Sequence, residues 1–218
     1  MHFNSNEKPI IIAIDGYSAS GKGTLAKRLA KHFSFEYLDT GILYRIIAYH
    51  CLKEDLYLQN KDKILSLTKK LNFNDIADKK FLHDEAVSQK ASEIAQIPDV
   101  RSALLSYQKN FPIGKKGVVL DGRDIGTVIF PNAICKIFVI ADINERAKRR
   151  FKQLQIFGKN IIYNHVLKYL KKRDERDKNR ALSPLKKAKD AFVLDTTHLT
   201  EEETLNKAIA YCNKKILN

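Results

Sequence analysis

Residues 10–33 read IIIAIDGYSASGKGTLAKRLAKHF, and this stretch decides the fold of the chain. Residues 10–14 are an unbroken apolar run, which is typical of a strand buried on both faces of a parallel sheet. From Lys22 onward, Leu25, Leu29 and Phe33 recur at a spacing of four residues, which predicts a helix that ends near His32. The sequence therefore predicts a strand, a glycine-rich loop and a helix in direct succession.

The loop between this strand and this helix fits the phosphate-binding pattern G-x-x-x-x-G-K, except that a glycine follows the lysine where Ser or Thr is usual. Glycines let backbone N–H groups turn toward phosphate oxygens, and the helix N-terminus adds a partial positive charge. A glycine-rich turn that binds nothing is disfavoured because both flanking elements are the expected ones. We therefore predict an ATP or GTP site formed by Gly16, Tyr17, Ser18, Ala19, Ser20, Gly21, Lys22, Gly23 and Thr24.

Four further short segments, at residues 35–38, 118–120, 136–140 and 192–194, are predicted to be strands. Helical patterns lie between or after them, and such alternation indicates an α/β fold with a five-stranded parallel sheet and helices on both faces. Each of these four segments leads into an aspartate. Because ligands of open α/β sheets gather at the carboxyl ends of the strands, we expect the site there. The four aspartates are Asp39, Asp121, Asp142 and Asp195.

The 218 residues are expected to form a single domain, 1–218, in which residues 42–111 are an insertion that covers the site. No run of 18 apolar residues occurs and residues 1–8 lack the apolar stretch of a secretory signal, so we expect a cytoplasmic protein without a membrane span. Three cysteines without close spacing fit reduced, packed thiols better than disulfides or a zinc site. They are Cys51, Cys135 and Cys212.

Positive charge is concentrated in one part of the chain. Residues 136–190 hold 17 Lys and Arg against 6 Asp and Glu, a net of +11 out of the formal +14 of the whole chain. A solvated lysine-rich surface accounts for the scattered lysines. The arginines are different, because Arg146, Arg149 and Arg150 lie at helical spacing in a predicted helix over 144–154 and share a face.

A second charged helix is predicted over residues 162–180. Its inward stripe runs from apolar residues at Tyr163 and Leu170 to Arg173, Asp177 and Arg180. These charges could belong to a solvated face. Because they continue a stripe that is otherwise buried, however, they should meet an anionic or hydroxyl-bearing ligand or one another.

Two smaller polar clusters leave alternatives open. Thr40 could contact a phosphate or simply cap the helix that follows it. Arg123 and Asp124 could act in a site or form a plain ion pair. For Mg²⁺, Thr24 is a displaced hydroxyl ligand and Asp121, at a strand end, is a second candidate.

Five segments together resemble the bacterial cytidylate kinases, in order and along nearly the whole chain. The resemblance implies a P-loop kinase fold, with residues 42–111 as the monophosphate-binding insertion and residues 145–180 as the lid and acceptor-binding helices. It also implies transfer of the γ-phosphoryl group of ATP to CMP or dCMP with Mg²⁺. The segments are GYSASGKGT (16–24), LDTGILYR (38–45), ASEIAQIPDVR (91–101), DGRDIGTVIFPNA (121–133) and KKRDERDKNR (171–180).

Residue roles follow from the same resemblance. The acceptor phosphate would be held by Thr40, Arg45, Arg123 and Arg180, the ribose by Arg173 and Asp177, and cytosine by Ser92, Arg101 and Asp124. Lys22, Arg123, Arg149, Arg150 and Arg180 would act on the transferring group. The family usually forms a small sheet between Leu71 and Val87, but this chain is shorter there.

Two rival interpretations are weaker. A nucleic-acid-binding module would need exposed aromatic side chains among the basic residues. A signalling GTPase would need N-K-x-D, whereas residues 60–63 read NKDK and precede three of the five predicted strands. We therefore expect ATP and CMP or dCMP as substrates of a monomer that binds neither nucleic acid nor membrane.

Overall fold

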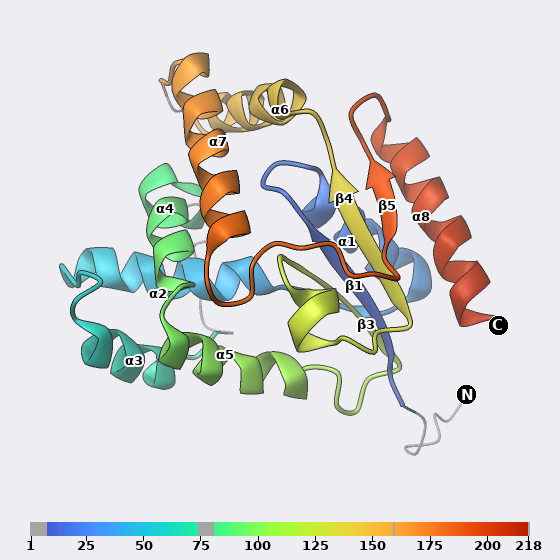
Figure 1. The fold of residues 1–218 in the computed structure, drawn as a ribbon, viewed down its shortest axis with the longest axis horizontal. Helices are drawn as coiled ribbons and strands as arrows, with labels where there is room; N and C mark the ends of the chain where they lie inside the picture. The colour runs from blue at the N-terminus through green and yellow to red at the C-terminus, as the bar shows by residue number, and fades with distance from the viewer. Residues whose placement is uncertain (1–7, 74–80, 159, 218) are drawn as a thin grey trace. The chain divides into compact units, whose positions relative to one another are not determined.

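The computed structural model describes residues 8–73, 81–158 and 160–217, which contain a five-stranded sheet (Figure 1). The strands are β1 Ile10–Gly16, β2 Glu36–Asp39, β3 Gly117–Gly122, β4 Cys135–Ile140 and β5 Phe192–Asp195. Their order across the sheet is β2-β3-β1-β4-β5, so the strand before the phosphate loop lies in the middle. β1 pairs in parallel with β3 and β4, and β4 pairs in parallel with β5. The predicted five-stranded parallel fold is therefore confirmed.

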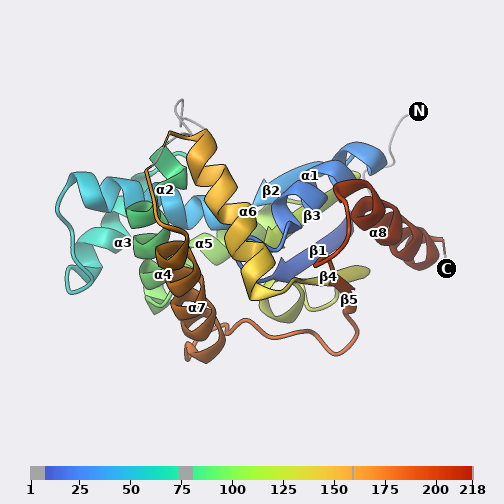
Figure 2. The same cartoon turned by 90° about the horizontal axis from the view of Figure 1, so that it is seen from above.

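One face of the sheet is covered by α1 (Lys22–Phe33) and α8 (Glu201–Ile216), as Figures 1 and 2 show. Because side chains alternate along a strand, every second residue of β1 points to this face. Ile12 and Ile14 do so, and both pack with Leu29 of α1 in a buried apolar core. The apolar periodicity of the predicted helix is thus the face of α1 that holds it on the sheet.

The opposite face of the sheet carries two buried ionisable side chains, Asp15 of β1 and Lys136 of β4. A short π-helical segment, η2 (Ile125–Ile129), follows β3 and lies on this face (Figure 2). A buried charge is costly unless it is paired or hydrogen-bonded, so the partners of these two side chains matter for the fold.

Two helices near the carboxyl end of β4 pack on each other: α6 (Ile143–Ile156) and α7 (Tyr163–Asn179). The side chain of Asp142 caps α6 by accepting hydrogen bonds from the N–H groups of Asn144 and Glu145, which lowers the pKa of the Asp142 carboxyl. The apolar cluster that α6 and α7 share is formed by Ala147, Leu154, Val166 and Leu170.

The chain divides into two compact units. Unit 1 contains Met1–Leu38, Pro112–Asn179 and Ser183–Asn218, and unit 2 contains Asp39–Phe111 and Arg180–Leu182. Unit 2 is helical in its described part and has its own apolar core around Ile47, Ile64 and Leu104. Its elements are α2 Thr40–Lys53, α3 Lys61–Lys70, η1 Phe81–His83, α4 Glu85–Ile94 and α5 Pro98–Asn110.

The segment where the family usually forms a small sheet is only partly described in this chain. Residues 74–80 lie outside the described residues. From residue 81 onward the chain forms η1 and then α4. All three cysteines are free and buried, as predicted. No helix among the described residues is long and apolar enough to cross a membrane.

Replacing Thr200 by alanine is expected to lower the free energy of unfolding by about 1 kcal/mol, because Thr200 caps α8. Its Oγ1 accepts a hydrogen bond from the N–H of Glu203, and the Glu203 carboxylate accepts in return from the Thr200 N–H at 2.8 Å. Urea unfolding of both proteins measures the difference. Substitution of the neighbouring exposed Glu201 by glutamine is the control, and equal unfolding midpoints for the threonine variant and wild type would contradict the prediction.

Candidate active site

The phosphate loop leaves β1 at a glycine that no other residue could replace without a shift of the backbone. A Cβ on Gly16 would lie 2.2 Å from the carbonyl oxygen of Val139 on β4, and Gly16 has a φ of +153°. At the other end, Gly21 has a φ of +88° and immediately precedes α1. Both glycines of the motif are therefore required by the geometry of the loop.

The lysine of the motif is held against the loop itself. The Lys22 ammonium donates a hydrogen bond to the carbonyl oxygen of Tyr17 at 3.2 Å, and the Ser20 hydroxyl donates to the same oxygen at 2.9 Å. A full positive charge is thus placed at the N-terminus of α1, where the helix dipole also favours an anion. This arrangement suits the polyphosphate of a nucleotide.

Arg149 reaches the same loop from α6. Its guanidinium donates to Thr196 Oγ1 at 3.0 Å and also to the Thr196 carbonyl oxygen at 2.5 Å, and its Nη1 lies 3.8 Å from the position of a Cβ on Gly21. Thr196 in turn donates to the carbonyl oxygen of Ser20 at 3.0 Å. The predicted site residue Arg149 therefore lies at the loop, beside Gly21, the residue that precedes Lys22.

Arg150, the other predicted catalytic residue of α6, has a different environment. Its guanidinium donates to Gln153 Oε1 at 2.8 Å, on the exposed side of the same helix. Arg149 and Arg150 are adjacent and so point in different directions on a helix. The predicted shared face of Arg146, Arg149 and Arg150 is therefore wrong for Arg150. The structure brings Arg149 to the phosphate loop, whereas Arg150 contacts Gln153 along its own helix.

Arg146 contacts the phosphate loop more extensively than Arg149 or Arg150 does. Its guanidinium donates to both carboxylate oxygens of Asp174 on α7, at 2.7 and 3.1 Å, and to the carbonyl oxygen of Ser18 at 3.3 Å. It also lies 4.9 Å from the centre of the Tyr17 ring. Arg146 is only 4% exposed, so these contacts offset the cost of burying its charge. The sequence placed it on a shared face with Arg149 and Arg150 but did not identify it as a site residue.

Asp121 and Thr24 are the candidates for holding a metal ion. The Asp121 carboxylate accepts a hydrogen bond from the Tyr37 hydroxyl at 2.7 Å, and its other oxygen lies 3.8 Å from where a Cβ on Gly23 would be. Thr24 lies in the first turn of α1 and is exposed. Mg²⁺ takes oxygen ligands and usually keeps several waters beside one or two carboxylates and substrate phosphates. One carboxylate and one hydroxyl near the loop fit that requirement, and among the described residues no group of three His, Cys, Asp or Glu side chains could hold a metal alone.

Three of the residues in unit 1 that are predicted to bind the acceptor nucleotide form a charged network. The Arg123 Nε donates to the Asp177 carboxylate at 2.8 Å, and the Arg173 Nε lies 3.9 Å from the same carboxylate oxygen. Asp177 is 4% exposed and is shared by the two arginines. The predicted charged end of the α7 stripe is therefore a real cluster, and two arginines beside one carboxylate leave net positive charge for an anion. Asp124, the fourth acceptor residue of this unit, is buried beside Arg123 in the chain.

The other residues that are predicted to bind the acceptor nucleotide belong to unit 2. Asp39, not Thr40, caps α2, because its side chain accepts the N–H of Ile42 at 3.1 Å. The interpretation of Thr40 as the cap is therefore wrong, and Thr40 is a buried residue in the first turn. The Arg45 guanidinium lies 3.6 Å from the Asp39 carboxylate. Thr40 and Arg45 thus share the N-terminal turns of one helix.

The residues predicted to bind cytosine and the acceptor phosphate in unit 2 are at least partly buried. Ser92 of α4 is buried, and Arg180 is 8% exposed. Arg101 of α5 donates to the carbonyl oxygen of Ala95 at 3.2 Å and lies 5.8 Å from the ring centre of Tyr44. Such anchoring holds the guanidinium in one orientation, which a residue that reads a planar base requires.

A P-loop kinase fold is the class that this sheet and this loop define. Two solved structures are similar in fold: an uncharacterized protein from Eubacterium ventriosum (TM-score 0.55, 15% identity, 94% of this chain and 98% of that chain) and a gluconokinase from Sinorhizobium meliloti (TM-score 0.51, 13% identity, 96% and 94%). The family model for cytidylate kinase matches residues 12–214, so the chain belongs to the cytidylate kinase family and is a phosphate-transferring enzyme.

Curated relatives agree with the family model over nearly the whole chain. The cytidylate kinase of Paramagnetospirillum magneticum is 46% identical over 208 residues, covering 94% of this chain and 98% of the relative. The cytidylate kinase of Bartonella henselae is 44% identical over 203 residues, covering 93% and 94%. The predicted family is thus confirmed.

Proposed function

We propose that the protein transfers the γ-phosphoryl group of ATP to the phosphate of CMP or dCMP, giving CDP or dCDP and ADP. The observation that carries the proposal is the placement of Lys22 and Arg149 at a phosphate loop in a chain of this family. The loop, residues 16–24, binds the phosphates of ATP. Its backbone N–H groups and the Lys22 ammonium are in place before the reaction and neutralise the negative charge of the phosphates.

The chemistry needs little beyond position and charge. An oxygen of the acceptor phosphate attacks the γ-phosphorus in line, the bond from that phosphorus to the β–γ bridging oxygen breaks, and ADP leaves with the electron pair. The attacking oxygen is already anionic, so no general base is required, and none of the roles in this mechanism falls to a histidine. Lys22, Arg123, Arg149, Arg150 and Arg180 stabilise the charge on the transferring group.

Mg²⁺ would accompany ATP, held by Thr24 and Asp121 together with phosphate oxygens. When bound, it supplies charge neutralisation at the β- and γ-phosphates. The support in this chain is the Asp121 carboxylate, which lies beside Gly23 at the end of β3 and accepts a hydrogen bond from the Tyr37 hydroxyl.

For the acceptor we propose the residues that the family resemblance names. Thr40, Arg45, Arg123 and Arg180 hold its phosphate, Arg173 and Asp177 hold its ribose, and Ser92, Arg101 and Asp124 read cytosine. The base chemistry agrees: the N4 amino group of cytosine donates to the Asp124 carboxylate, and its O2 and N3 accept from the Arg101 guanidinium. Uracil presents an acceptor at O4 and a donor at N3, so CMP should be preferred over UMP.

We further propose that residues 42–111 act as the monophosphate-binding insertion and residues 145–180 as the lid with the acceptor-binding helices. Closure of the lid over ATP would exclude water, which otherwise competes as acceptor. A cytoplasmic monomer remains our expectation for the protein in the cell.

The packing of the basic region disfavours nucleic acid as the partner. Phe151, Tyr163 and Tyr169 pack against the apolar cluster of α6 and α7, and the rings of Phe151 and Tyr163 meet edge to face with centres 6.0 Å apart. Rings used in this way are not free to stack on bases. The arginines of residues 136–190 are better explained by nucleotide phosphates, and the scattered exposed lysines by a solvated surface.

A coupled assay of ADP release tests the proposal directly. With ATP and Mg²⁺, purified protein should release ADP rapidly with CMP and dCMP, and several powers of ten more slowly with UMP, as measured by kcat/KM. AMP and GMP serve as controls. Absence of CMP-dependent ADP release, together with a salt-sensitive gel shift of RNA, would replace the proposal with the nucleic-acid interpretation.

Replacing Arg180 by alanine should mainly weaken the use of CMP. The loss of one charge-assisted hydrogen bond to the acceptor phosphate is expected to lower kcat/KM for CMP by about 30-fold. The KM for ATP should stay near the wild-type value. The matched control is Lys172→Ala, which removes an exposed cation from α7. Normal CMP kinetics in the Arg180 variant would remove this residue from the site.

A further inference from the structure

Asp15, the residue directly before the phosphate loop, sends its side chain to the face of the sheet opposite α1. The carboxylate is 5% exposed, and its two oxygens accept hydrogen bonds from two consecutive backbone N–H groups, those of Ile125 and Gly126, each at 2.8 Å. These are the first two residues of η2. One side chain at the start of the phosphate loop thus holds a segment that lies 110 residues further along the chain.

The same residue also fixes the other end of the segment that carries Arg123 and Asp124. In the parallel pairing of β1 with β3, Asp15 lies opposite Gly122. Only Arg123 and Asp124 separate Gly122 from Ile125. The backbone of Asp15 therefore lies beside the residue before this pair, and its carboxylate binds the residue after it.

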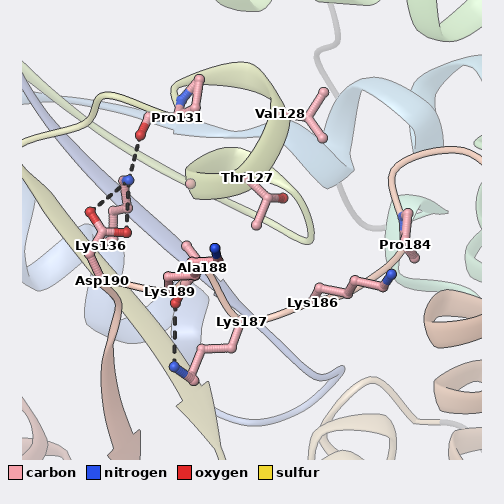
Figure 3. A pocket seen from close by; sticks show the side chains of 11 residues that line it. Thr127, Val128, Pro131, Lys136, Pro184, Lys186, Lys187, Ala188, Lys189 and Asp190 are labelled. Carbon is pink, nitrogen blue, oxygen red and sulfur yellow. Dashed lines mark hydrogen bonds and ion pairs between the residues drawn. The ribbon is translucent and has the colours of Figure 1, made fainter.

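Packing encloses η2 on one side and leaves it open on another. On one side the fit is tight, because a Cβ on Gly126 would lie 3.3 Å from the Lys136 side chain and 3.4 Å from an Asp15 carboxylate oxygen. On another side η2 borders an open cavity of about 490 Å³, which Thr127 and Val128 line together with Lys136 and Asp190 (Figure 3). The two hydrogen bonds to Asp15 therefore add to the packing of the buried Ile125 and Ile129 in fixing where this segment lies.

The Asp15 carboxylate makes hydrogen bonds to the backbone rather than an ion pair with the neighbouring lysine. Lys136 directs its ammonium to Asp190 at 2.8 Å and to the carbonyl oxygen of Pro131. Burial raises the pKa of Asp15 to about 7 although both N–H groups lower it, and Asp124 and Arg123 act in opposite directions. Since the charged form is costly here, a neutral side chain of the same shape should be tolerated by the fold.

We propose that Asp15 is a positioning residue for the acceptor nucleotide: by holding both ends of the Arg123–Asp124 pair, it fixes these two side chains relative to the phosphate loop. This inference rests on the proposed function, because it takes Arg123 and Asp124 as acceptor-binding residues. Asp15 itself touches neither substrate. Its effect should therefore appear in acceptor binding and base selection rather than in ATP binding.

The test is Asp15→Asn, assayed by ADP release with separate titrations of CMP, UMP and ATP. Asparagine keeps one acceptor oxygen and loses the other, so we expect the KM for CMP to rise about five- to tenfold and the preference for CMP over UMP to fall by a similar factor. The KM for ATP should change by less than about twofold, because the loop residues are untouched. Thr200→Ala, which destabilises the same unit far from this segment, should leave all three values unchanged.

A second variant changes Gly126, whose N–H donates one of the two hydrogen bonds to Asp15. Gly126→Ala places a methyl group against the Lys136 stem and the Asp15 carboxylate, and it should raise the KM for CMP in the same selective way. If Asp15→Asn does not fold, the glycine variant decides. Equal changes in the KM values for ATP and CMP, or an unchanged CMP preference in a folded variant, would overturn the positioning role. Failure of the proposed function itself looks different, because the wild-type protein would then release no CMP-dependent ADP.

Discussion

Replacing Lys22 by alanine is expected to lower kcat by a factor of about 10² to 10³, the usual effect of removing one preorganised charge donor. The structure gives the reason, because the ammonium is already held by the Tyr17 carbonyl oxygen at the N-terminus of α1. It therefore needs little reorganisation when charge develops on the transferring group. Steady-state ADP release at saturating ATP and CMP measures the effect.

The control for this variant is Lys31→Ala, which removes an exposed lysine from the last turn of the same helix. Its kcat should match that of wild type, and the thermal unfolding of both variants should show that they are folded. Wild-type turnover in the Lys22 variant would refute the assignment of residues 16–24 as the ATP phosphate site.

Asp124→Asn is expected to change the choice of base. The aspartate carboxylate only accepts hydrogen bonds and so suits the N4 amino group of cytosine, whereas asparagine can also donate to O4 of uracil. We expect the ratio of kcat/KM for CMP to that for UMP to fall by about 10² to 10³, out of the roughly 10⁴ that an unpaired polar group in a buried site can produce. Asp124 is 5% exposed, which makes such a mismatch costly.

Measurements with CMP, UMP and dCMP on the same preparation test this prediction. Asp62→Asn changes an exposed acid in the first turn of α3 and should leave the ratio unchanged. An Asp124 variant that still prefers CMP as strongly as wild type would show that another group reads the N4 position. In that case Arg101 and Ser92 become the next residues to vary.

The sheet and the phosphate loop could be predicted from the sequence because both depend on local patterns. The segments 10–14 and 136–140 lie within observed strands, and the loop follows from the pattern G-x-x-x-x-G-K between a strand and a helix. The predicted helix over 162–180 is observed as α7, Tyr163–Asn179. Buried strands and amphipathic helices leave a periodic signal that neighbouring residues reinforce.

The contacts that fix the site could not be predicted in the same way. Arg146 shares its helix face with Arg149, but only the fold shows that it meets Asp174 and the Ser18 carbonyl. The sequence indicates Asp15 only as a residue at the end of a strand, and its partners are 110 and 111 residues away. The cap of α2 is Asp39 and not Thr40, because the Asp39 carboxylate, one residue earlier, accepts the Ile42 N–H. Pairings of this kind depend on tertiary structure, which a local pattern does not encode.

The buried guanidinium of Arg146 has a consequence for any motion over the nucleotide. It joins the first turns of α6, the second half of α7 and the backbone at Ser18, so swinging both helices away as one rigid piece would keep the ion pair with Asp174 but break the hydrogen bond to the Ser18 carbonyl oxygen and expose the guanidinium. Bending at the far ends of the two helices leaves these bonds intact. We therefore expect hydrogen exchange to be slow around residues 143–147 and faster toward residues 154–158, with the pivot of the motion at the arginine.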